Sequence, residues 1–378
     1  MILERAEELL KTQKLCNHCL GRAFAKLGKG TNEERGRAIR FVLSMEGKEF
    51  DEPEVCGLCG GVFERLDELA EKCTEKARDY EFESFMVGSS FPEEVLEKEG
   101  ALFEGLPSEP INREFNRELG KRLERALGKR AERKNPDLTF LVEPYSGRVK
   151  IRTRSVYIYG RYRKLVRGIP QTPLKGYKES VASMITRPFA KAFGGKAVFH
   201  GAGREDVDVR MLGSGRPFFV EVKNPRRRRV ELEEIAREIN ASGKAEVFGL
   251  RYSSGEEMKG VLSERHDKEY EALVYVPQGT DEGDLRKVLE VLNGAVIHQR
   301  TPRRVLKRRS DLTRVRKVYK VSGEVVDGTH LRLRIFCEGG LYIKELISGD
   351  GGRTSPSVSE ILAKEAVCEA LDVINVER

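Results

Sequence analysis

The sequence of 378 residues contains no tryptophan and no run of about 18 apolar residues, the length at which a membrane-spanning helix becomes a candidate. It also does not begin with the basic segment and apolar stretch of a secretory signal. We therefore expect a cytoplasmic protein without a membrane segment. A Gly-x-x-x-x-Gly-Lys-Ser/Thr loop is absent as well, which disfavours an NTPase, and the Gly-x-Gly strings at 201–203 and 213–215 lack a full dinucleotide or methyl-donor fingerprint.

Charged residues make up 34% of the chain, and 69 Lys and Arg outnumber 61 Asp and Glu, which gives a net charge of +8. The hydrophobic content of 39% still permits packed cores, and the length predicts two or three domains. The cations concentrate in three acid-poor segments, at 148–178, 223–229 and 300–320. A solvated face explains one such segment, whereas three favour binding to nucleic-acid phosphates. Tyrosines within 148–178 are expected to stack on unpaired bases, which favours structured RNA.

Four of the 7 cysteines form two Cys-x-x-Cys pairs, Cys16 with Cys19 and Cys56 with Cys59. In a cytoplasmic protein such pairs indicate metal ligands before disulfides. Two pairs complete the tetrahedral thiolate shell that Zn²⁺ prefers, and a closed shell leaves no position for a reacting water, so we predict a structural Zn²⁺. An iron–sulfur cluster and redox cysteines are the alternatives. His18 lies inside the first pair, and we expect it to be a bystander.

The chain is expected to divide into three parts. Residues 1–61 form the zinc-binding module, with a helix after a capping box at 31–34. Residues 62–165 alternate helix and strand signals and predict a compact α/β domain, while residues 166–378 are richer in strands and predict an α+β domain on a mostly antiparallel sheet. The main elements expected are helices near 62–79 and 113–127 and strands at 138–143, 149–159, 218–222, 272–276 and 331–336.

One charged string, at 200–210, is the candidate site of a reaction. Its glycines permit close approach of the backbone, and carboxylates then alternate with arginines on what should be a loop leading into a strand. Asp206 lies between Arg204 and Arg210 in the sequence, so ion pairing is expected to keep it ionised. A positioned carboxylate can serve as nucleophile or general base at a glycosidic carbon. From the residues alone, a surface cluster of ion pairs explains the string at least as well.

Three short motifs resemble those of pseudouridine synthases. Gly203–Asp206 resembles the Gly-Arg-x-Asp element around their catalytic aspartate. Lys268–Tyr270, followed by an apolar strand, resembles their second motif, whose aromatic residue stacks on the target base. Gly340–Leu346 resembles their third motif, whose basic residue pairs with the catalytic aspartate. The motifs follow one another in the expected order along the chain.

Longer strings are similar to one family, the archaeal tRNA pseudouridine(54/55) synthases. These strings are Gly203–Gly213, Gln299–Val305 and Gly349–Pro356. Members carry an N-terminal double Cys-x-x-Cys zinc element and a THUMP-like domain, and Asn135–Asp137 before two strands fits the end of such a domain. The resemblance implies an α+β protein, with a zinc knuckle and a THUMP-like α/β RNA-binding domain (62–165) before a mostly antiparallel pseudouridine synthase catalytic domain (166–378).

The resemblance also implies the activity and the site residues. The expected reaction is isomerisation of uridine to pseudouridine at positions 54 and 55 in the T arm of tRNA, with Asp206 as the catalytic carboxylate. Tyr270 would stack on the flipped base, Tyr342 would line its pocket, and Lys344 would pair with Asp206. Arg204 would fill the gap that the base leaves or anchor a phosphate. Asp208, two residues after Asp206, does not align with the family's aspartate and is expected to be structural.

The implied partner is tRNA, without an obligatory protein partner, and an isomerisation requires no organic cofactor. Two other functions fit parts of the sequence. A THUMP-bearing methyltransferase or sulfur-transferring enzyme would require a methyl-donor glycine loop or an ATP loop, which the sequence lacks. A non-catalytic THUMP-type tRNA-binding protein or tRNA chaperone would use the same basic surface, and an activity assay with an Asp206 substitution separates it from the enzyme.

Overall fold

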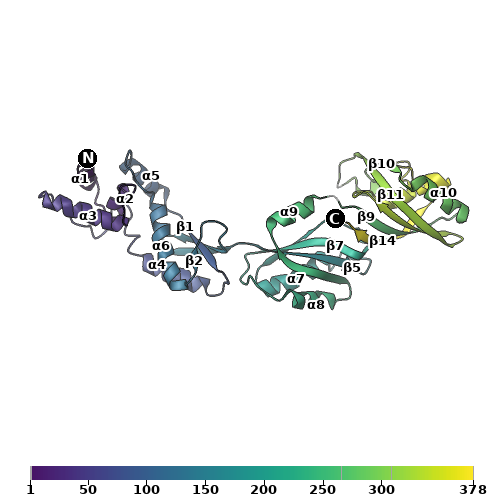
Figure 1. The fold of residues 1–378 in the computed structure, drawn as a ribbon, viewed down its shortest axis with the longest axis horizontal. Helices are drawn as coiled ribbons and strands as arrows, with labels where there is room; N and C mark the ends of the chain where they lie inside the picture. The colour runs from purple at the N-terminus through teal and green to yellow at the C-terminus, as the bar shows by residue number, and fades with distance from the viewer. Residues whose placement is uncertain (1, 265, 308, 378) are drawn as a thin grey trace. The chain divides into compact units, whose positions relative to one another are not determined.

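The computed structural model describes residues 2–264, 266–307 and 309–377, which fold into two compact units (Figure 1). The first unit comprises Met1–Arg154 together with Asn224–Arg228, and the second comprises Ser155–Lys223 and Arg229–Arg378. Within the described ranges, no helix is long and apolar enough to span a membrane. Each unit has its own cluster of buried apolar side chains.

The first unit combines helices with a four-stranded sheet of order β2-β1-β3-β4. The pairs β1–β2 and β1–β3 are parallel, and β3–β4 is an antiparallel hairpin. One continuous core joins the cysteine-rich helices to the sheet. The elements are α1 (Ile2–Thr12), α2 (Asn17–Ala23), α3 (Asn32–Met45), α4 (Leu66–Ala77), β1 (Ser84–Ser89), α5 (Glu93–Leu102), α6 (Ile111–Leu127), β2 (Arg130–Ala131), β3 (Leu138–Glu143) and β4 (Arg148–Thr153).

Local sequence signals set the ends of the helices in the first unit. The predicted capping box begins α3, where the Thr31 side chain accepts from the backbone N–H of Glu34 and the Glu34 side chain accepts from that of Thr31. Helix α6 ends at Gly128, whose left-handed φ of 65° suits a residue without Cβ. Close packing of α2 on α3 requires Gly21, because a Cβ there would lie 1.8 Å from the backbone oxygen of Asn32.

The second unit is built on a 10-stranded sheet of order β13-β10-β11-β12-β9-β14-β7-β5-β8, with β6 also paired to β7. Its strands are β5 (Val156–Lys164), β6 (Lys196–Gly201), β7 (Val209–Lys223), β8 (Ala245–Ser253), β9 (Lys268–Tyr275), β10 (Val296–Arg300), β11 (Thr313–Asp327), β12 (His330–Cys337), β13 (Thr354–Ser355) and β14 (Val367–Val376). Its helices are α7 (Val181–Phe193), α8 (Leu232–Asn240), α9 (Gly255–Ser263), α10 (Glu282–Leu292), the 3₁₀ turn η1 (Arg303–Val305), α11 (Ile343–Ser348) and α12 (Val358–Leu362).

The sheet of the second unit confirms the predicted α+β class. Its strand pairs are antiparallel apart from the parallel pair β14–β7. Helices α7 and α8 lie together against the part of the sheet that holds β5 and β7 (Figure 1). Residues Leu371–Val373 of β14 pair with Val209–Met211 of β7, while the opposite edge of β14 pairs with β9. This arrangement brings the start of β7 close to β9.

The single strand expected at 149–159 is in fact two strands that belong to different sheets. Strand β4 pairs with β3 in the first unit, whereas β5 pairs with β7 and β8 in the second. The boundary between the compact units therefore falls after Arg154 and not at 165. Buried residues fall on odd positions in β4 and mainly on even positions in β5, so the alternation changes phase at 154–155, which one continuous strand does not explain.

Candidate active site and metal centre

A cavity of about 440 Å³ in the second unit contains every residue that we assigned to catalysis or substrate binding. Arg204 and Asp206 come from the loop between β6 and β7, Tyr270 comes from β9, and Tyr342 and Lys344 come from the start of α11. Segments far apart in the sequence thus line the same cavity. Convergence of titratable and aromatic side chains in a cavity is typical of an active site.

The Asp206 carboxylate faces Arg304 and not Arg204. Arg304 Nη1 donates to Asp206 Oδ2 at 2.8 Å, and Lys344 Nζ lies 3.6 Å from the same oxygen. Arg204 has no ion pair within the described part of the chain. The Asp206 side chain remains 42% exposed, so its carboxylate can be reached from the cavity. The two neighbouring cations orient this carboxylate, but only Lys344 was expected to do so from the motifs.

Arg304 lies on the short turn η1 and also binds Glu345, a buried residue of α11. Arg304 Nε donates to Glu345 Oε1 at 2.6 Å, and the guanidinium carbon lies 5.8 Å from the ring centre of Tyr342. Burial by itself would lower the pKa of Arg304, but the bonds to Glu345 and Asp206 raise it above its ordinary value. The string Gln299–Val305 contained this residue, yet it did not show which arginine reaches the carboxylate.

Lys344 makes its shortest contacts with Asp208. The ammonium donates to both Asp208 oxygens, at 2.6 and 2.8 Å, which are shorter than its distance to Asp206. Burial would raise the pKa of Asp208, but the hydrogen bond and charge of Lys344 lower it below its ordinary value. Asp208 thus remains an anion that holds Lys344 in place beside Asp206, which suits the structural role expected for it.

A buried network anchors the loop that carries Asp206. Glu205 accepts from the Tyr162 hydroxyl at 2.8 Å and from Arg216 Nε at 3.0 Å. The buried Lys164 ammonium donates to the backbone oxygens of Asp206 and Val207, at 2.9 and 3.0 Å. The bonds of Glu205 hold the residue before Asp206, and the bonds of Lys164 hold the backbone of Asp206 and of the residue after it.

These anchors correct one expectation from the sequence. Lys164 and Tyr162 lie in the segment 148–178 that we assigned to RNA binding, but both are fully buried. Tyr159 is only 7% exposed, so neither it nor Tyr162 can stack on RNA bases. A count of cations and tyrosines along the chain cannot separate side chains that face solvent from those that face the core, and strand β5 alternates between the two.

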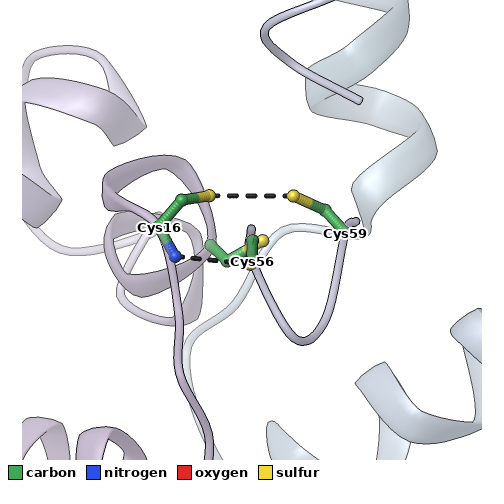
Figure 2. A group of neighbouring side chains, drawn as sticks. Cys16, Cys56 and Cys59 are labelled. Carbon is green, nitrogen blue, oxygen red and sulfur yellow. Dashed lines mark hydrogen bonds between the residues drawn. The ribbon is translucent and has the colours of Figure 1, made fainter. Parts of the chain in front are cut away.

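The four predicted metal ligands meet in the first unit. The Sγ atoms of Cys16, Cys19, Cys56 and Cys59 lie within 4.8 Å of one another, and this is the one such group of possible metal ligands among the described residues. Figure 2 shows Cys16 and Cys59 directed at each other, with their sulfurs 3.7 Å apart. A tetrahedral Zn²⁺ site with Zn–S bonds of about 2.3 Å has sulfurs about 3.8 Å apart. The donor set and its spacing therefore fit Zn²⁺.

The surroundings of the cysteines suit a closed site. The backbone N–H of Cys16 donates to Cys56 Sγ at 3.3 Å, and the fully buried Arg22 places Nη2 3.6 Å from Cys19 Sγ. Such donors stabilise thiolates. The ring of His18 instead stacks on Phe63 at 4.4 Å, outside the sulfur cluster, as expected of a bystander.

Comparisons with known proteins cover the whole chain. A family model described as "Pus10, C-terminal" matches residues 157–377, and one described as "Pus10 THUMP domain, archaeal" matches residues 69–143. A protein of Pyrococcus furiosus named tRNA pseudouridine synthase Pus10 is 59% identical, over 100% of this chain and 98% of its own length. Proteins of the same name from Methanopyrus kandleri and Thermoplasma acidophilum are 42% and 41% identical, over 99% and 98% of this chain and 98% of each relative.

Proposed function

Because the chain belongs to the Pus10 family of tRNA pseudouridine synthases, we propose that it isomerises uridine at positions 54 and 55 in the T arm of tRNA, with Asp206 as the catalytic carboxylate. The enzyme is an isomerase. The observation that supports the site assignment is the gathering of Asp206, Tyr270, Tyr342 and Lys344 in a single cavity. To detach and reattach a base, the enzyme requires an accessible carboxylate and a surface that holds the base. Two cations hold the carboxylate of Asp206 here, and aromatic rings lie in the same cavity.

The reaction exchanges one glycosidic bond for another within the same nucleotide. The bond from N1 to C1′ breaks, the uracil turns, and a bond from C5 to C1′ forms, while C5 loses a proton and N1 gains one. Asp206 acts at the ribose, either at C1′ or on the 2′ proton, and both routes use an ionised carboxylate. Atoms and electrons balance without ATP or a redox cofactor, so the residues of the cavity suffice.

The target uridine must leave the folded T arm to reach Asp206, at an unstacking cost of a few kcal/mol, on the order of 2–4. Tyr270 lies on β9 at the cavity wall and would stack on the flipped base, which offsets about 1–3 kcal/mol of that cost. Arg204 lines the same cavity and has no ion pair among the residues described, so it remains available to a phosphate beside the flipped nucleotide.

We also propose that the four cysteines hold a structural Zn²⁺, because four thiolates leave no open coordination position. When bound, the ion would link the segments around α2 and the turn at 56–59, and it would contribute to folding and not to the reaction. The proposed partner is tRNA, without an obligatory protein partner, and the proposed location is the cytoplasm.

The function is tested by mapping pseudouridine in an unmodified tRNA transcript after incubation with the pure protein. We expect new pseudouridine at positions 54 and 55 and at no other uridine. Transcripts with cytidine at one of the two positions serve as controls, and each should still be modified at the other. Pseudouridine outside the T arm would contradict the proposed positions, and a complete absence of product would contradict the proposed reaction.

A further inference from the structure

His266, which lines the cavity just before β9, has a ring nitrogen for which the described residues supply no partner. The residue is 4% exposed, and its Nε2 lies 3.2 Å from the backbone oxygen of Val261. Because a carbonyl oxygen only accepts, the contact with Val261 places a proton on Nε2, and Nδ1 of that tautomer presents a lone pair. Within the described part of the chain, this buried Nδ1 has no hydrogen-bond donor. A buried acceptor left unpaired destabilises the protein, which favours a donor from a ligand.

Lys268 places an ammonium group at the backbone of His266, in the same cavity. Its Nζ donates to the backbone oxygen of His266 at 2.8 Å, and its side chain lines the same cavity. An ammonium has three protons, so it can also donate to a ligand. Lys268 and Tyr270 occupy alternate positions of β9 and therefore point to the same face, about 7 Å apart. A base stacked on Tyr270 would thus extend towards Lys268 and His266.

An acceptor at His266 Nδ1 and a donor at Lys268 Nζ together match one edge of uracil. Uracil presents the donor N3–H between two acceptor oxygens, O2 and O4, on the side of the ring away from C6. Cytosine presents an acceptor at N3 and an amino donor at C4, so its N3 would oppose the lone pair of Nδ1. We propose that His266 Nδ1 accepts from N3–H of the flipped uracil while Lys268 Nζ donates to the adjacent carbonyl oxygen. This inference rests on the proposed function and adds the two residues that select uracil.

The same contacts serve substrate and product. The turn that brings C5 to the place of N1 has an axis through N3 and C6, and it exchanges O2 with O4. N3–H lies on this axis, so it can keep its hydrogen bond to His266 Nδ1. Lys268 faces one of the two carbonyl oxygens before the turn and the other after it. Tyr270 and Asp206 line the same cavity, so a base stacked on Tyr270 lies near the proposed catalytic carboxylate. Asp206 would act at C1′ while His266 and Lys268 hold the opposite edge.

The test uses the full-length protein and tRNA transcripts that carry uridine or 3-methyluridine at a target position. The methyl group replaces the N3–H donor and projects at Nδ1. For the wild-type protein we expect kcat/KM to fall at least about 30-fold with 3-methyluridine, since one buried hydrogen bond and a steric conflict are involved. His266→Ala removes the acceptor and makes room for the methyl group. It should lower kcat/KM for uridine about tenfold and reduce the preference over 3-methyluridine to about threefold or less.

Matched variants separate recognition from a structural effect. His266→Asn keeps an acceptor near the position of Nδ1, so this variant should retain most of the wild-type preference. His266→Leu, which introduces a side chain of similar size without an acceptor, should not. His298→Ala removes an exposed histidine of β10 and should leave the preference unchanged. Lys268→Met should lower kcat/KM for both substrates by the same factor. If the Ala variant does not fold, the Asn and Leu variants still decide.

Two outcomes would overturn the inference. One is a His266→Ala protein that prefers uridine as strongly as the wild type, and the other is equal preference in the Asn and Leu variants. Failure of the proposed function is distinguishable, because then the wild-type protein would not isomerise the uridine transcript at all. If the wild-type protein turns over uridine and every His266 variant keeps the wild-type preference over 3-methyluridine, only the proposed recognition of the uracil edge is refuted.

Discussion

Arg304 connects the proposed catalytic carboxylate to the body of the second unit. Its guanidinium bonds to Asp206 at 2.8 Å and to the buried Glu345 at 2.6 Å, and it lies over the ring of Tyr342. A planar guanidinium can bridge two carboxylates in a fixed geometry, which the single point charge of a lysine ammonium does less well. We therefore expect Arg304 to act as a positioning residue that orients Asp206 before tRNA binds.

We expect Arg304→Gln to lower the single-turnover rate about 10- to 100-fold, because a hydrogen bond to a charged group contributes about 1.5–3 kcal/mol. The affinity for tRNA should change little. Arg303→Gln on the same turn is the control, since Asp206 pairs with Arg304 and Lys344 and has no contact with the Arg303 side chain among the described residues. It should affect affinity more than rate. A wild-type rate for Arg304→Gln at saturating enzyme would show that this bond does not position the carboxylate.

At the level of single residues, the motifs predicted which side chains gather but not all of their partners. Asp206, Tyr270 and Lys344 line one cavity, as the order of the motifs implied. Their immediate contacts depend on pairing between distant strands and on the path of loops, which a linear pattern does not contain. For this reason the sequence does not predict the contact of Arg304 with Asp206 or the contacts of the buried Lys164 with the loop backbone.

At the level of elements, predictions based on local signals agree best with the structure. The capping box fixes the start of α3, and Gly128 fixes the end of α6. Strand β3 spans the residues expected, 138–143. The break between β4 and β5 depends instead on which sheet each strand joins, and that choice is made by tertiary packing. The alternation of buried residues changes phase between the two strands, but it does not say which sheet each strand joins.

The cysteine-rich segment should depend on its metal. We expect Cys16→Ser or Cys59→Ser to lose one bound Zn²⁺ per chain and to destabilise the first unit, because metal binding to four thiolates contributes on the order of 10 kcal/mol to folding. Cys73→Ala is the matched control, since Cys73 is buried in the same core but lies outside the sulfur cluster. Metal analysis and thermal unfolding measure both effects.

The zinc assignment would be refuted by a chelator that leaves both the metal content and the melting curve of the wild-type protein unchanged. Loss of iron and sulfide in place of Zn²⁺ would instead indicate the iron–sulfur alternative. Equal metal loss in Cys73→Ala and Cys16→Ser would show that general unfolding, and not ligand removal, releases the ion.

At the level of the whole molecule, exposed cations in both units are available to tRNA. Arg148, Lys150 and Arg152 alternate along β4 and are exposed on one face of the first sheet. In the second unit, Arg303 and Lys307 are exposed at η1 and just after it. Two linked binding surfaces raise the effective concentration of tRNA at the second one. We therefore expect the first unit to contribute affinity while the second performs the reaction.

If the first unit contributes affinity and the second performs the reaction, removing the three cations of β4 should affect binding but not the rate. Replacing Arg148, Lys150 and Arg152 by Gln should weaken tRNA binding and reduce the slope of log affinity against log salt by about 0.9 for each phosphate that the protein no longer neutralises. The rate at saturating enzyme should stay near that of the wild type. Truncation at 165 would be a poorer experiment, because it would remove β5, which pairs with both β7 and β8.

The control removes the same number of cations from helices of the first unit. Arg5, Lys11 and Lys72 each pair with a glutamate of the same helix. Their replacement by Gln should leave the salt slope unchanged. If the β4 variant binds tRNA with the affinity and salt slope of the wild type, the β4 surface does not contact tRNA.

Single-turnover formation of pseudouridine by Asp206→Asn tests most directly whether Asp206 performs the chemistry. Asparagine keeps the shape of the side chain but cannot act as a carboxylate. We predict no pseudouridine at positions 54 and 55, with tRNA affinity within about tenfold of the wild type, because affinity is spread over many phosphate contacts. Asp208→Asn, which changes a nearby carboxylate, should retain measurable turnover. Turnover by Asp206→Asn at a rate near that of the wild type would contradict the assignment.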